Sequence, residues 1–405
     1  MTAALDGITV VDLTQAVSGP FTTRLLAQMG ARVIKVERPG TGDVIRMWDT
    51  IVQGQCSGHA WVNPGKESVA LDLKTDEGRA LLAKLVERAD VVIENFVPGT
   101  LESFGFSYEK FKALKPDVIL CRISGFGQTG PYRDRAAMDL IIQGEAGLVL
   151  TNGTPDTPAK ISVSICDITT AFYATMSILQ ALYHRRGTGR GQEVQVSMLE
   201  STLTLTGYFP YMYWYANQLP ERVGLHHHTI APYGPYECRD GRSVIIIGGG
   251  AGAARWKKFC EAIGRPDMFE NPKFGSNQLR IANRPELDGQ ICAEISKRDR
   301  AFWLEHFHAH DVPCGALNDM GEALEHPVVK ARGFVKELPS ATGPIKSFDF
   351  PPIFSELQAV NEKGPPVLGE HTAKVLAELG LDAAGIEALR AAGVVECAKA
   401  SEAPK

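Results

Sequence analysis

The stretch 10-VVDLTQAVSGPFTTRLLAQMGARVIKVERPG-40 decides the fold, because it alternates a strand-like run, a helical pattern and a second strand-like run. In 20-PFTTRLLAQMG-30 the apolar residues recur at helical spacing, whereas 32-RVIKVE-37 is a β-branched run typical of a buried strand. Two strands joined through a helix pair in parallel. The stretch therefore predicts a βαβ unit whose second strand ends at Glu37, with Arg38 next to it, where a nucleotide's ribose and phosphate can bind.

The same alternation continues along the chain. Further strands are predicted at 90-DVVIEN-95 and 117-DVILCRI-123, and helices at 76-DEGRALLAKLVERA-89 and 106-FSYEKFKAL-114. The segments 167–186 and 193–209 extend the same domain. Strands that alternate with helices in short succession predict a parallel, doubly wound α/β sheet with helices on both faces.

The sequence pattern changes near residue 225. The stretch 231-APYGPYECRDGRSVIIIGGG-250 contains two strand-like runs around the turn 239-RDGR-242, and 255-RWKKFCEAIG-264 is an amphipathic helix that ends at glycine. A chain of 405 residues also exceeds the usual size of one domain. We predict three parts, a large domain, a small α+β domain, and a linker with a C-terminal segment, at residues 1–215, 225–325 and 326–405.

The composition indicates an ordinary soluble protein. Hydrophobic residues make up 44% of the chain and charged residues 22%, and the net charge of −5 arises from interspersed acids and bases. This pattern argues against nucleic acid or a membrane surface as the main partner. The N-terminus shows no export signal, no apolar run reaches membrane-spanning length, and the eight cysteines are scattered, so we expect a cytoplasmic protein with reduced thiols.

Two glycine-rich stretches resemble dinucleotide loops. The motif 125-GFGQTG-130 follows a strand, but Pro131 and a polar run separate it from the next helix, whereas a dinucleotide loop leads straight into one. After 248-GGGAGA-253 the expected second strand ending in an acid is missing. Neither stretch predicts an NAD site. The second can instead be a flexible lid that offers backbone N–H groups to developing negative charge, or a plain tight turn.

The triplet 226-HHH-228 does not predict a metal site. In an extended segment consecutive side chains point to opposite faces, so three in a row cannot bind one ion, and no typical partner motif is nearby. A polar wall for a carboxylate substrate, or a surface turn, is the alternative. We predict no metal.

A single carboxylate, Asp139, stands ahead of the apolar run in 135-RAAMDLIIQGEAGL-148. Asp139 can be the N-cap of a helix that begins at residue 140, because aspartate accepts hydrogen bonds from free helix amides. A carboxylate that faces a cleft can also act as a covalent nucleophile. From the residues alone both roles remain open.

A series of motifs across nearly the whole chain resembles the class III CoA-transferases, the family that includes formyl-CoA transferase, carnitine CoA-transferase and the α-methylacyl-CoA racemases. The order and spacing of the motifs carry the resemblance. They are 19-GPF-21, 33-VIKVERPGTGD-43, 63-NPGKESVALDLK-74, 94-ENFVPG-99, 124-SGFGQTGPY-132, 138-MDLIIQ-143, 187-GTGRGQ-192, 232-PYGPYECRDGR-242 and 369-GEHT-372.

The resemblance implies a fold, an assembly and a mechanism. The fold is a large Rossmann-like domain with a smaller domain, and two ring-like subunits thread through each other as an interlocked homodimer. Asp139 corresponds to the catalytic aspartate, which attacks an acyl-CoA thioester and forms a mixed anhydride. Gly248, Gly249 and Gly250 match the glycine loop that covers the site. The reactants are an acyl-CoA and a carboxylic acid, and no cofactor is needed beyond the CoA thioester.

The resemblance also implies which residues bind CoA. The matching positions are Val17, Arg38, Lys66, Asn95 and Phe96. The chain departs from the family in two places, because it has Val97 and Ser103 where basic residues are common. These departures leave the cations that bind the CoA phosphates undetermined.

The resemblance favours a transferase over a racemase. Racemases have a histidine immediately before the aspartate, whereas this chain has Met138, which cannot carry a proton, and the matched acid Asp167 alone serves one face of the substrate poorly. The segment 159-AKISVSICDITTAFYA-174 resembles relatives that act on short dicarboxylates, such as succinyl-CoA with itaconate, mesaconate or malate.

Three alternatives to this assignment stay open: a racemase, aromatic or carnitine-like acceptors beside 208-YFPYMYWY-215, and an inactive partner of an unlike subunit. The distal carboxylate of a dicarboxylate needs a cation or hydrogen-bond donors. Arg46, His226, His227 and His228 are the predicted candidates.

Overall fold

The computed structural model describes residues 2–250 and 252–398, which form two compact units. Unit 1 comprises Met1–Ala146, Ile161–Gly207 and Lys330–Lys405, and unit 2 comprises Gly147–Lys160 and Tyr208–Val329. The predicted large domain, 1–215, therefore contains two segments, 147–160 and 208–215, that group with unit 2. The C-terminal segment groups with unit 1.

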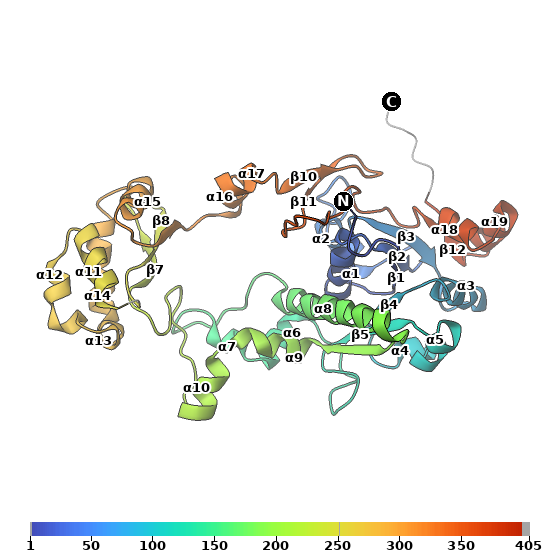
Figure 1. Ribbon diagram of the computed structural model, residues 1–405, viewed down its shortest axis with the longest axis horizontal. Coiled ribbons are helices and arrows are strands. Elements are labelled where there is room, and N and C mark those ends of the chain that lie inside the picture. The colour runs from blue at the N-terminus through green and yellow to red at the C-terminus, as the bar shows by residue number, and fades with distance from the viewer. Residues whose placement is uncertain (1, 251, 399–405) are drawn as a thin grey trace. The chain divides into compact units, whose positions relative to one another are not determined.

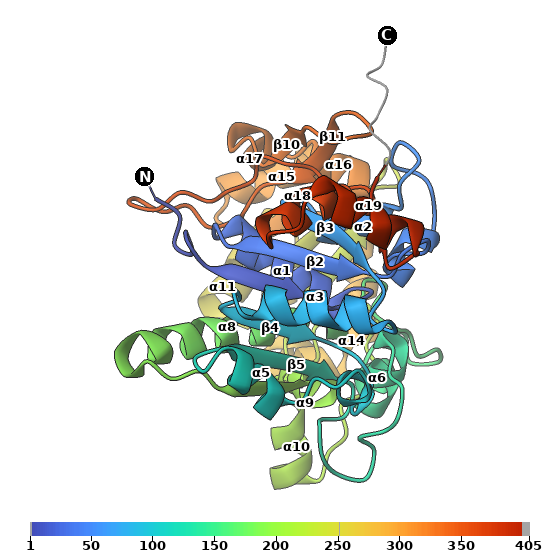
Figure 2. The ribbon, with the colours of Figure 1, turned by 90° about the vertical axis from the view of Figure 1, so that its right-hand side faces the viewer.

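Unit 1 is built on a sheet with the strand order β12-β3-β2-β1-β4-β5-β6. The strands β3, β2, β1, β4 and β5 can be followed in Figure 2. All neighbouring pairs are parallel except β12 and β3. The predicted parallel, doubly wound sheet is confirmed. The strand bounds are β1 Thr9–Asp12, β2 Arg32–Glu37, β3 Lys66–Leu71, β4 Val91–Glu94, β5 Ile119–Ser124, β6 Glu193–Ser197 and β12 Val395–Glu396.

Successive residues along each strand fill two separate cores, one on each face of the sheet. Val10 and Val33 pack in one cluster, whereas their neighbours Val11 and Ile34 pack in the other. This division follows from the two-residue period of a strand, and it explains why both residues of each pair are apolar. One core is covered by α1 (Ser18–Gln28) and α8 (Ile165–Thr188), and the other by α3 (Asp76–Val86), α5 (Tyr108–Leu114), α18 (Thr372–Glu378) and α19 (Ala383–Ala391) (Figures 1 and 2).

Helix α8 has the length and apolar composition that would also suit a membrane span, alone among the helices of the described residues. Four of its apolar side chains, Cys166, Ala171, Ala174 and Ile178, are fully buried, and the helix contacts α1, α9 (Met198–Leu203), β5 and β6. These contacts place one side of α8 in the core of unit 1.

The sequence prediction did not name the strands β3, β6, β10, β11 and β12 of unit 1. Residues 66–71 form β3, and the segment 193–209 is not one element, because β6 ends at Ser197 and α9 begins directly after it. The Ser197 side chain caps α9 by accepting from the amide of Glu200. The remaining elements of unit 1 are η1 Val44–Met47, α2 Ser57–Val62, α4 Thr100–Ser103, α6 Asp139–Glu145, η2 Thr204–Thr206, β10 Val335–Leu338 and β11 Ile345–Phe348.

Unit 2 packs helices against a small antiparallel sheet, as the predicted α+β domain requires. β7 (Tyr233–Glu237), β8 (Ser243–Ile247) and β9 (Cys314–Ala316) form the sheet, with the predicted turn between the first two. Its core contains Trp256, Phe259 and Phe307. Its helices are α7 Leu148–Thr151, α10 Phe209–Ala216, α11 Ala253–Ala262, α12 Asp267–Glu270, η3 Pro272–Phe274, α13 Asn277–Ala282, α14 Arg284–Ile295, α15 Arg300–Ala309 and α16 Met320–Leu324, and α17 Pro327–Ala331 lies at the unit boundary.

The aromatic stretch 208–215, which a run of aromatic residues predicts to be a buried helix, instead carries the exposed helix α10. Tyr211, Trp214 and Tyr215 are 59%, 66% and 83% exposed in the single chain. Aromatic residues that remain exposed together usually mark a contact surface rather than a core. The prediction of a buried helix at 208–215 is therefore wrong for the single chain.

Candidate active site

The carboxyl ends of β1 and β4 form the topological switch point of the sheet, because the chain continues from them toward opposite edges. Ligands of open α/β sheets bind in the crevice outside this point. Two adjoining cavities lie here in unit 1, of about 130 Å³ and about 350 Å³, and both are lined by Gln15 after β1 and Phe96 after β4. The fold alone therefore places a binding site at these two loops.

The smaller cavity has the features of a nucleotide site. It lies at the ends of β1, β2 and β3, and the rings of Phe96 and Phe104 supply apolar surface for a base. The exposed cations Arg38 and Lys74 line it, and neither forms an ion pair within the described residues. Unpaired cations at such a site can bind phosphates. The prediction named Arg38 but not Lys74, although Lys74 closes a family motif.

The larger cavity holds the carboxylates. Asp139 and Asp167 line it together with Ser18, Ser124 and Arg135. Arg135 is the only basic side chain among its described lining residues, and its guanidinium lies 3.5 Å from the ring centre of Tyr132. This cavity therefore combines a possible nucleophile with one cation.

The glycine motif after β5 brings the backbone close to Asp139. A Cβ atom at Gly125 would lie 2.2 Å from the Cβ of Ala137, so only glycine allows this approach. Gly127 and Gly130 both have φ of +94°, and the chain makes a turn after them before α6 begins at Asp139. The geometry differs from a dinucleotide loop, which would continue directly as a helix.

Asp139 is not the N-cap of its own helix. Met138 occupies that position, with no side-chain capping bond, and Asp139 is the first residue of α6. Its Oδ1 accepts from the amide of Cys166 in the first turn of α8, at 2.8 Å, and its Oδ2 accepts from the side-chain amide of Gln143 at 2.6 Å. The carboxylate is partly exposed. It is thus oriented by two donors and still faces the cavity.

Asp167 is held in a different electrostatic environment. Burial, and then the negative charge of Asp139, raise the pKa of Asp167 to about 7, against hydrogen bonds from Ser18 that lower it. A strongly shifted carboxyl group in a cavity is typical of functional sites. The sequence indicated Asp167 only as the counterpart of a racemase acid, because the shift depends on the tertiary approach of α6 and α8.

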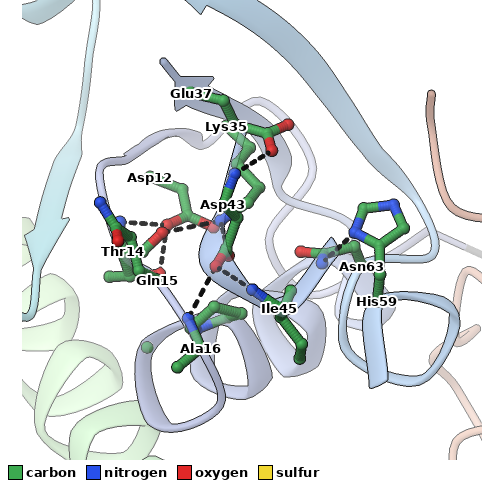
Figure 3. Close-up of polar contacts among 12 residues, drawn as sticks. Asp12, Thr14, Gln15, Ala16, Lys35, Glu37, Asp43, Ile45, His59 and Asn63 are labelled. Atoms are coloured by element: carbon green, nitrogen blue, oxygen red, sulfur yellow. Dashed lines mark hydrogen bonds and ion pairs between the residues drawn. The ribbon is translucent and has the colours of Figure 1, made fainter. Parts of the chain in front are cut away.

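The loop after β1 is held in a strained conformation by a buried acid. Ala16 has φ of +61°, which is unfavourable for a residue with a Cβ atom. Its amide donates to Oδ1 of Asp43 at 2.9 Å, and the same oxygen accepts from Ile45 at 3.1 Å (Figure 3). Gln15, next to it, forms two backbone hydrogen bonds of 2.8 Å with the side chain of Asn95. These contacts fix the loop that lines both cavities.

A network of buried charges lies beneath this loop (Figure 3). Lys35 donates to the carbonyl oxygen of Thr14 at 2.7 Å and lies 2.9 Å from Asp43, with both charged side chains fully buried. Burial alone would raise the pKa of Asp12, but Lys35 and Lys66 lower it well below its usual range. Burial lowers the pKa of Lys66 to about 7, against the charge of Asp12, which raises it. Through the hydrogen bond from Lys35 to the carbonyl of Thr14, this network holds the loop after β1 in place.

The predicted CoA-binding residues fall into two groups. Arg38, Asn95 and Phe96 line the cavities, and so does the buried Val17. Lys66 does not, because its side chain is fully buried and its ammonium group donates to the carbonyl of Pro20 and the side chains of Asn63 and Asp12. The matched motif therefore places Lys66 under the site, in the position of a structural cation.

Arg46 is already paired. Its guanidinium forms two bonds of 2.7 Å with Glu37, and it also donates to the carbonyl oxygen of Pro366. The side chain is 14% exposed. This geometry leaves Arg46 poorly suited to bind a substrate carboxylate, and Arg135, which the prediction did not name, is the cation that lines the Asp139 cavity.

The glycine loop of unit 2 is tightly packed. The amides of Gly248 and Gly249 both donate to the carbonyl oxygen of Pro232, at 3.1 and 3.2 Å. A Cβ atom at Gly249 would lie 2.1 Å from the carbonyl oxygen of Ala231, so the position requires glycine. The amides of Gly248 and Gly249, two of the three predicted oxyanion donors, are thus already hydrogen-bonded within unit 2. The third, Gly250, has φ of +86°. The covering role of this loop stays a prediction.

The histidine triplet also lies in unit 2. His226 and His228 line a cavity of about 940 Å³ with Arg222 and Arg284, whereas His227 stacks on Tyr233 with ring centres 5.0 Å apart. Within the described residues, no group of three or more His, Cys, Asp or Glu side chains is arranged to hold a metal ion. The three histidines therefore do not act as one set, and their role in substrate binding stays a prediction.

The chain is similar to known CoA-transferases over nearly its whole length. The chain is 36% identical to the succinate–glutarate CoA-transferase of Agrobacterium fabrum, over 93% of this chain and 95% of that protein. It is 36% identical to the succinyl-CoA:mesaconate CoA-transferase of Haloarcula marismortui, over 94% and 97%. A crystal structure of a CAIB/BAIF family protein from Brucella suis superposes with a TM-score of 0.85 and 34% identity, over 94% of this chain and 100% of that one.

The family model described as CoA-transferase family III matches residues 5–372, which include both cavities, Asp139 and all of unit 2. The family and the enzyme class predicted from the motifs are confirmed, and so is the fold class. The chain belongs to CoA-transferase family III.

Proposed function

We propose that the enzyme transfers CoA from succinyl-CoA to a short dicarboxylate, and that Asp139 is the nucleophile. The position of Asp139 carries the proposal: its oriented, partly exposed carboxylate lines the cavity that adjoins the nucleotide-like site at the switch point. CoA would bind with its nucleotide near Arg38 and Lys74 and its thioester at Asp139. The named substrates of the relatives, which include succinate, glutarate and mesaconate, support the dicarboxylate class.

The reaction proceeds by exchange of carboxyl partners. An oxygen of Asp139 bonds to the thioester carbonyl, the C–S bond breaks, and its electron pair goes to sulfur, which gives an aspartyl anhydride and CoA thiolate. The thiolate attacks the aspartyl carbonyl, releases the donor acid and leaves CoA on Asp139. The acceptor carboxylate then attacks the aspartyl thioester, whose C–S bond breaks to give a second anhydride and CoA thiolate. The thiolate attacks the acceptor carbonyl of this anhydride, which forms the acceptor thioester and frees the Asp139 carboxylate. Each step exchanges one activated acyl bond for another, so no external energy source is needed.

We further propose that Arg135 binds the distal carboxylate of the acceptor. Arg135 is the basic side chain that lines the same cavity as Asp139, and its stacking on Tyr132 holds its planar group in place. Arginine binds carboxylates through two parallel hydrogen bonds. A dicarboxylate can thus place one carboxylate at the nucleophile and the other on this guanidinium. Glutarate, mesaconate, itaconate and malate are the acids to compare.

The test is CoA exchange between succinyl-CoA and these acids, with Asp139→Asn as the key variant. The wild-type enzyme is expected to form the acceptor thioester, and hydroxylamine is expected to trap acylated Asp139 as a hydroxamate identified by mass spectrometry. Asp139→Asn should lose both signals. Full transfer by Asp139→Asn would exclude the covalent mechanism, and α-proton exchange of a methylacyl-CoA without acceptor would favour a racemase instead.

We also propose that two copies of the chain assemble as the interlocked homodimer of the family. Exposed apolar side chains support an assembly, because Phe172, Met176 and Tyr183 on α8 are 48%, 47% and 82% exposed in the single chain. The mass of one chain is 44.0 kDa, and light scattering coupled to size-exclusion chromatography should give twice this mass. Met176→Lys should weaken the dimer, and a wild-type protein that stays monomeric would refute it.

A further inference from the structure

A cavity of about 940 Å³ lies entirely within unit 2, and no step of the proposed reaction uses it. A volume of this size is in the range of small-molecule sites. Its wall is formed by the segment 220–226, β7 and the start of α14, and it carries four nitrogen-bearing side chains, Arg222, His226, His228 and Arg284. One carboxylate, that of the exposed Glu221, lines the same cavity. The cavity therefore has the size and the charge of a site for an anion.

The two arginines of this cavity have no carboxylate partner. Arg222 donates to the carbonyl oxygens of residues 154 and 155, at 2.9 and 2.7 Å. Arg284 donates to the carbonyl oxygens of His227 and Ile230, at 2.8 and 3.1 Å. Carbonyl oxygens hold a guanidinium group in place but carry no net charge, and no carboxylate of the described residues forms an ion pair with either arginine. Both positive charges thus remain available to a ligand.

Three buried nitrogen atoms on the lining residues lack a hydrogen-bond partner within the described part of the chain. They are Nη1 of Arg284, Nδ1 of His226 and Nε2 of His228. Buried polar groups are nearly always paired, so a group of unpaired ones indicates a missing ligand, ion or water. A guanidinium nitrogen is always a donor, and an imidazole nitrogen is a donor when it carries the proton. These atoms therefore favour a ligand rich in hydrogen-bond acceptors.

The fold holds His226 in the wall of the cavity. A Cβ atom at Gly234 in β7 would lie 2.4 Å from Nδ1 of His226, so glycine lets the imidazole pack directly against the strand. The Nε2 atom lies 3.9 Å from a carboxylate oxygen of Asp288, whose other oxygen accepts from the hydroxyl of Tyr236 at 2.7 Å. His226 is thus a fixed part of the wall.

We propose that this cavity is a binding site for a small organic anion with two or more negative charges, either a polycarboxylate or a phosphate ester. Arg222 and Arg284 supply the positive charge, His226 and His228 supply further hydrogen-bond donors, and Glu221 weakens the attraction. Every lining residue belongs to unit 2, so the site does not depend on the cavities of unit 1 or on the proposed transferase function.

The test is isothermal titration calorimetry of the full-length protein with citrate and with inorganic pyrophosphate, at an ionic strength kept constant with sodium chloride. The wild-type protein is expected to bind at least one of these probes at one site per chain. Arg222→Gln should weaken binding about tenfold, because one charged interaction is lost. Arg298→Gln, at an exposed position of unit 2 outside the cavity, is the matched control and should leave the affinity unchanged. Binding of citrate alone identifies a polycarboxylate ligand, and binding of pyrophosphate alone identifies a phosphate ester.

Charge changes at exposed positions of the wall test the same site if Arg222→Gln folds poorly. Glu221→Gln removes the acid of the cavity and should tighten binding about threefold. Leu225 lines the cavity and is 72% exposed, so a polar side chain there does not disturb the core. Leu225→Glu should weaken binding about threefold, whereas Leu225→Gln, which has the same shape without the charge, should not. A purely structural role of the wall would produce neither the gain nor the difference.

Arg38→Ala and Arg135→Gln separate this cavity from the two cavities of unit 1, and both should leave the affinity unchanged. Loss of binding in these two variants overturns the inference, and so does an affinity that does not respond to Glu221→Gln and Leu225→Glu. A wild-type protein that binds neither probe in a saturable manner also overturns it. The proposed transferase function stands or fails separately, by the exchange of CoA between succinyl-CoA and the acceptor acids.

Discussion

The side-chain amide of Gln143 lies 2.6 Å from Oδ2 of Asp139 and 3.0 Å from the carbonyl oxygen of Ile161. Its oxygen accepts from the amide of Ile161 at 2.9 Å, so this fully buried side chain ties Asp139 to the segment before α8. The four-residue spacing places both side chains on one face of α6. Gln143 therefore orients the proposed nucleophile through the hydrogen bond to its Oδ2.

Replacing Gln143 by glutamate removes the donor to Asp139 and keeps an acceptor for Ile161. We expect kcat to fall about 100-fold, because a misplaced nucleophile loses the attack geometry. The KM for succinyl-CoA should change little, since Gln143 does not line the nucleotide-like cavity. Gln195→Glu, at an exposed position of β6, is the matched control. An unchanged kcat in Gln143→Glu would mean that the cavity orients Asp139 without this contact.

Arg135→Gln is expected to lower kcat/KM for glutarate or mesaconate about 30-fold, because the distal carboxylate loses a charged hydrogen-bond partner. The rate with a monocarboxylate of similar size should change little, and Arg135→Lys should retain part of the preference. Arg133→Gln, two residues away in the same loop and paired with Asp134, is the control. Equal losses with both acceptor types would contradict the proposed role in specificity.

Arg38→Ala and Lys74→Ala are each expected to raise the KM for succinyl-CoA about tenfold, which corresponds to the loss of one charged hydrogen bond to phosphate. The kcat should stay near the wild-type value, because Arg38 and Lys74 line the smaller cavity, whereas Asp139 lines the larger one. The difference should shrink as salt increases. The control is Lys110→Ala on α5, because Lys110 is exposed and lines neither cavity, and this variant should leave KM unchanged.

Asp43→Asn is expected to destabilise the fold by about 3–5 kcal/mol, because it leaves the Lys35 ammonium buried without its partner. Urea unfolding followed by circular dichroism measures the change, with Asp6→Asn at an exposed position as the control. The variant should also lower kcat, since Asp43 holds the amide of Ala16 in the site loop. A loss of stability below about 1 kcal/mol would show that water, or a rearrangement of nearby side chains, replaces the lost partner of the Lys35 ammonium group.

Glu94 gives a prediction for the pH dependence of stability. Burial raises the pKa of Glu94 to about 7. Arg122 lies 3.8 Å from Glu94 and lowers this pKa, but Arg122 also pairs with Glu102 and Glu193. The folded state thus holds this proton more tightly than the unfolded chain does. Its contribution to stability is full below about pH 4.5 and is lost as pH rises through about 7.

Glu94→Gln should remove this dependence. The variant is expected to be more stable than the wild-type enzyme at pH 8, by up to roughly 3 kcal/mol, with a smaller difference at pH 5. The glutamine oxygen can still accept from the amide of Phe96, which Glu94 holds at 2.8 Å. Urea unfolding at both pH values measures the change, and a parallel shift at both would exclude Glu94 as the titrating group.

Much of unit 1 could be predicted from the sequence, because its strands are short β-branched runs and its helices show regular apolar spacing. The strands β1, β2, β4 and β5 and the helices α1, α3 and α5 lie close to their predicted positions. β3 was missed because Lys66, Glu67 and Ser68 interrupt its apolar pattern. The buried ammonium group of Lys66 donates hydrogen bonds to the carboxylate of Asp12 and to the carbonyl oxygen of Pro20. These partners are distant in sequence, so the local pattern of residues does not reveal them.

The sequence by itself determined the doubly wound fold and the family, since these depend on local periodicity and on motifs that keep their order along the chain. Only the tertiary structure decided how these residues act together. Arg46 became a structural partner of Glu37, Arg135 became the cation that lines the cavity of Asp139, and Asp167 came to line the same cavity. The physical reason is that burial and charge pairing depend on contacts between residues far apart in the chain, which spacing along the sequence does not encode.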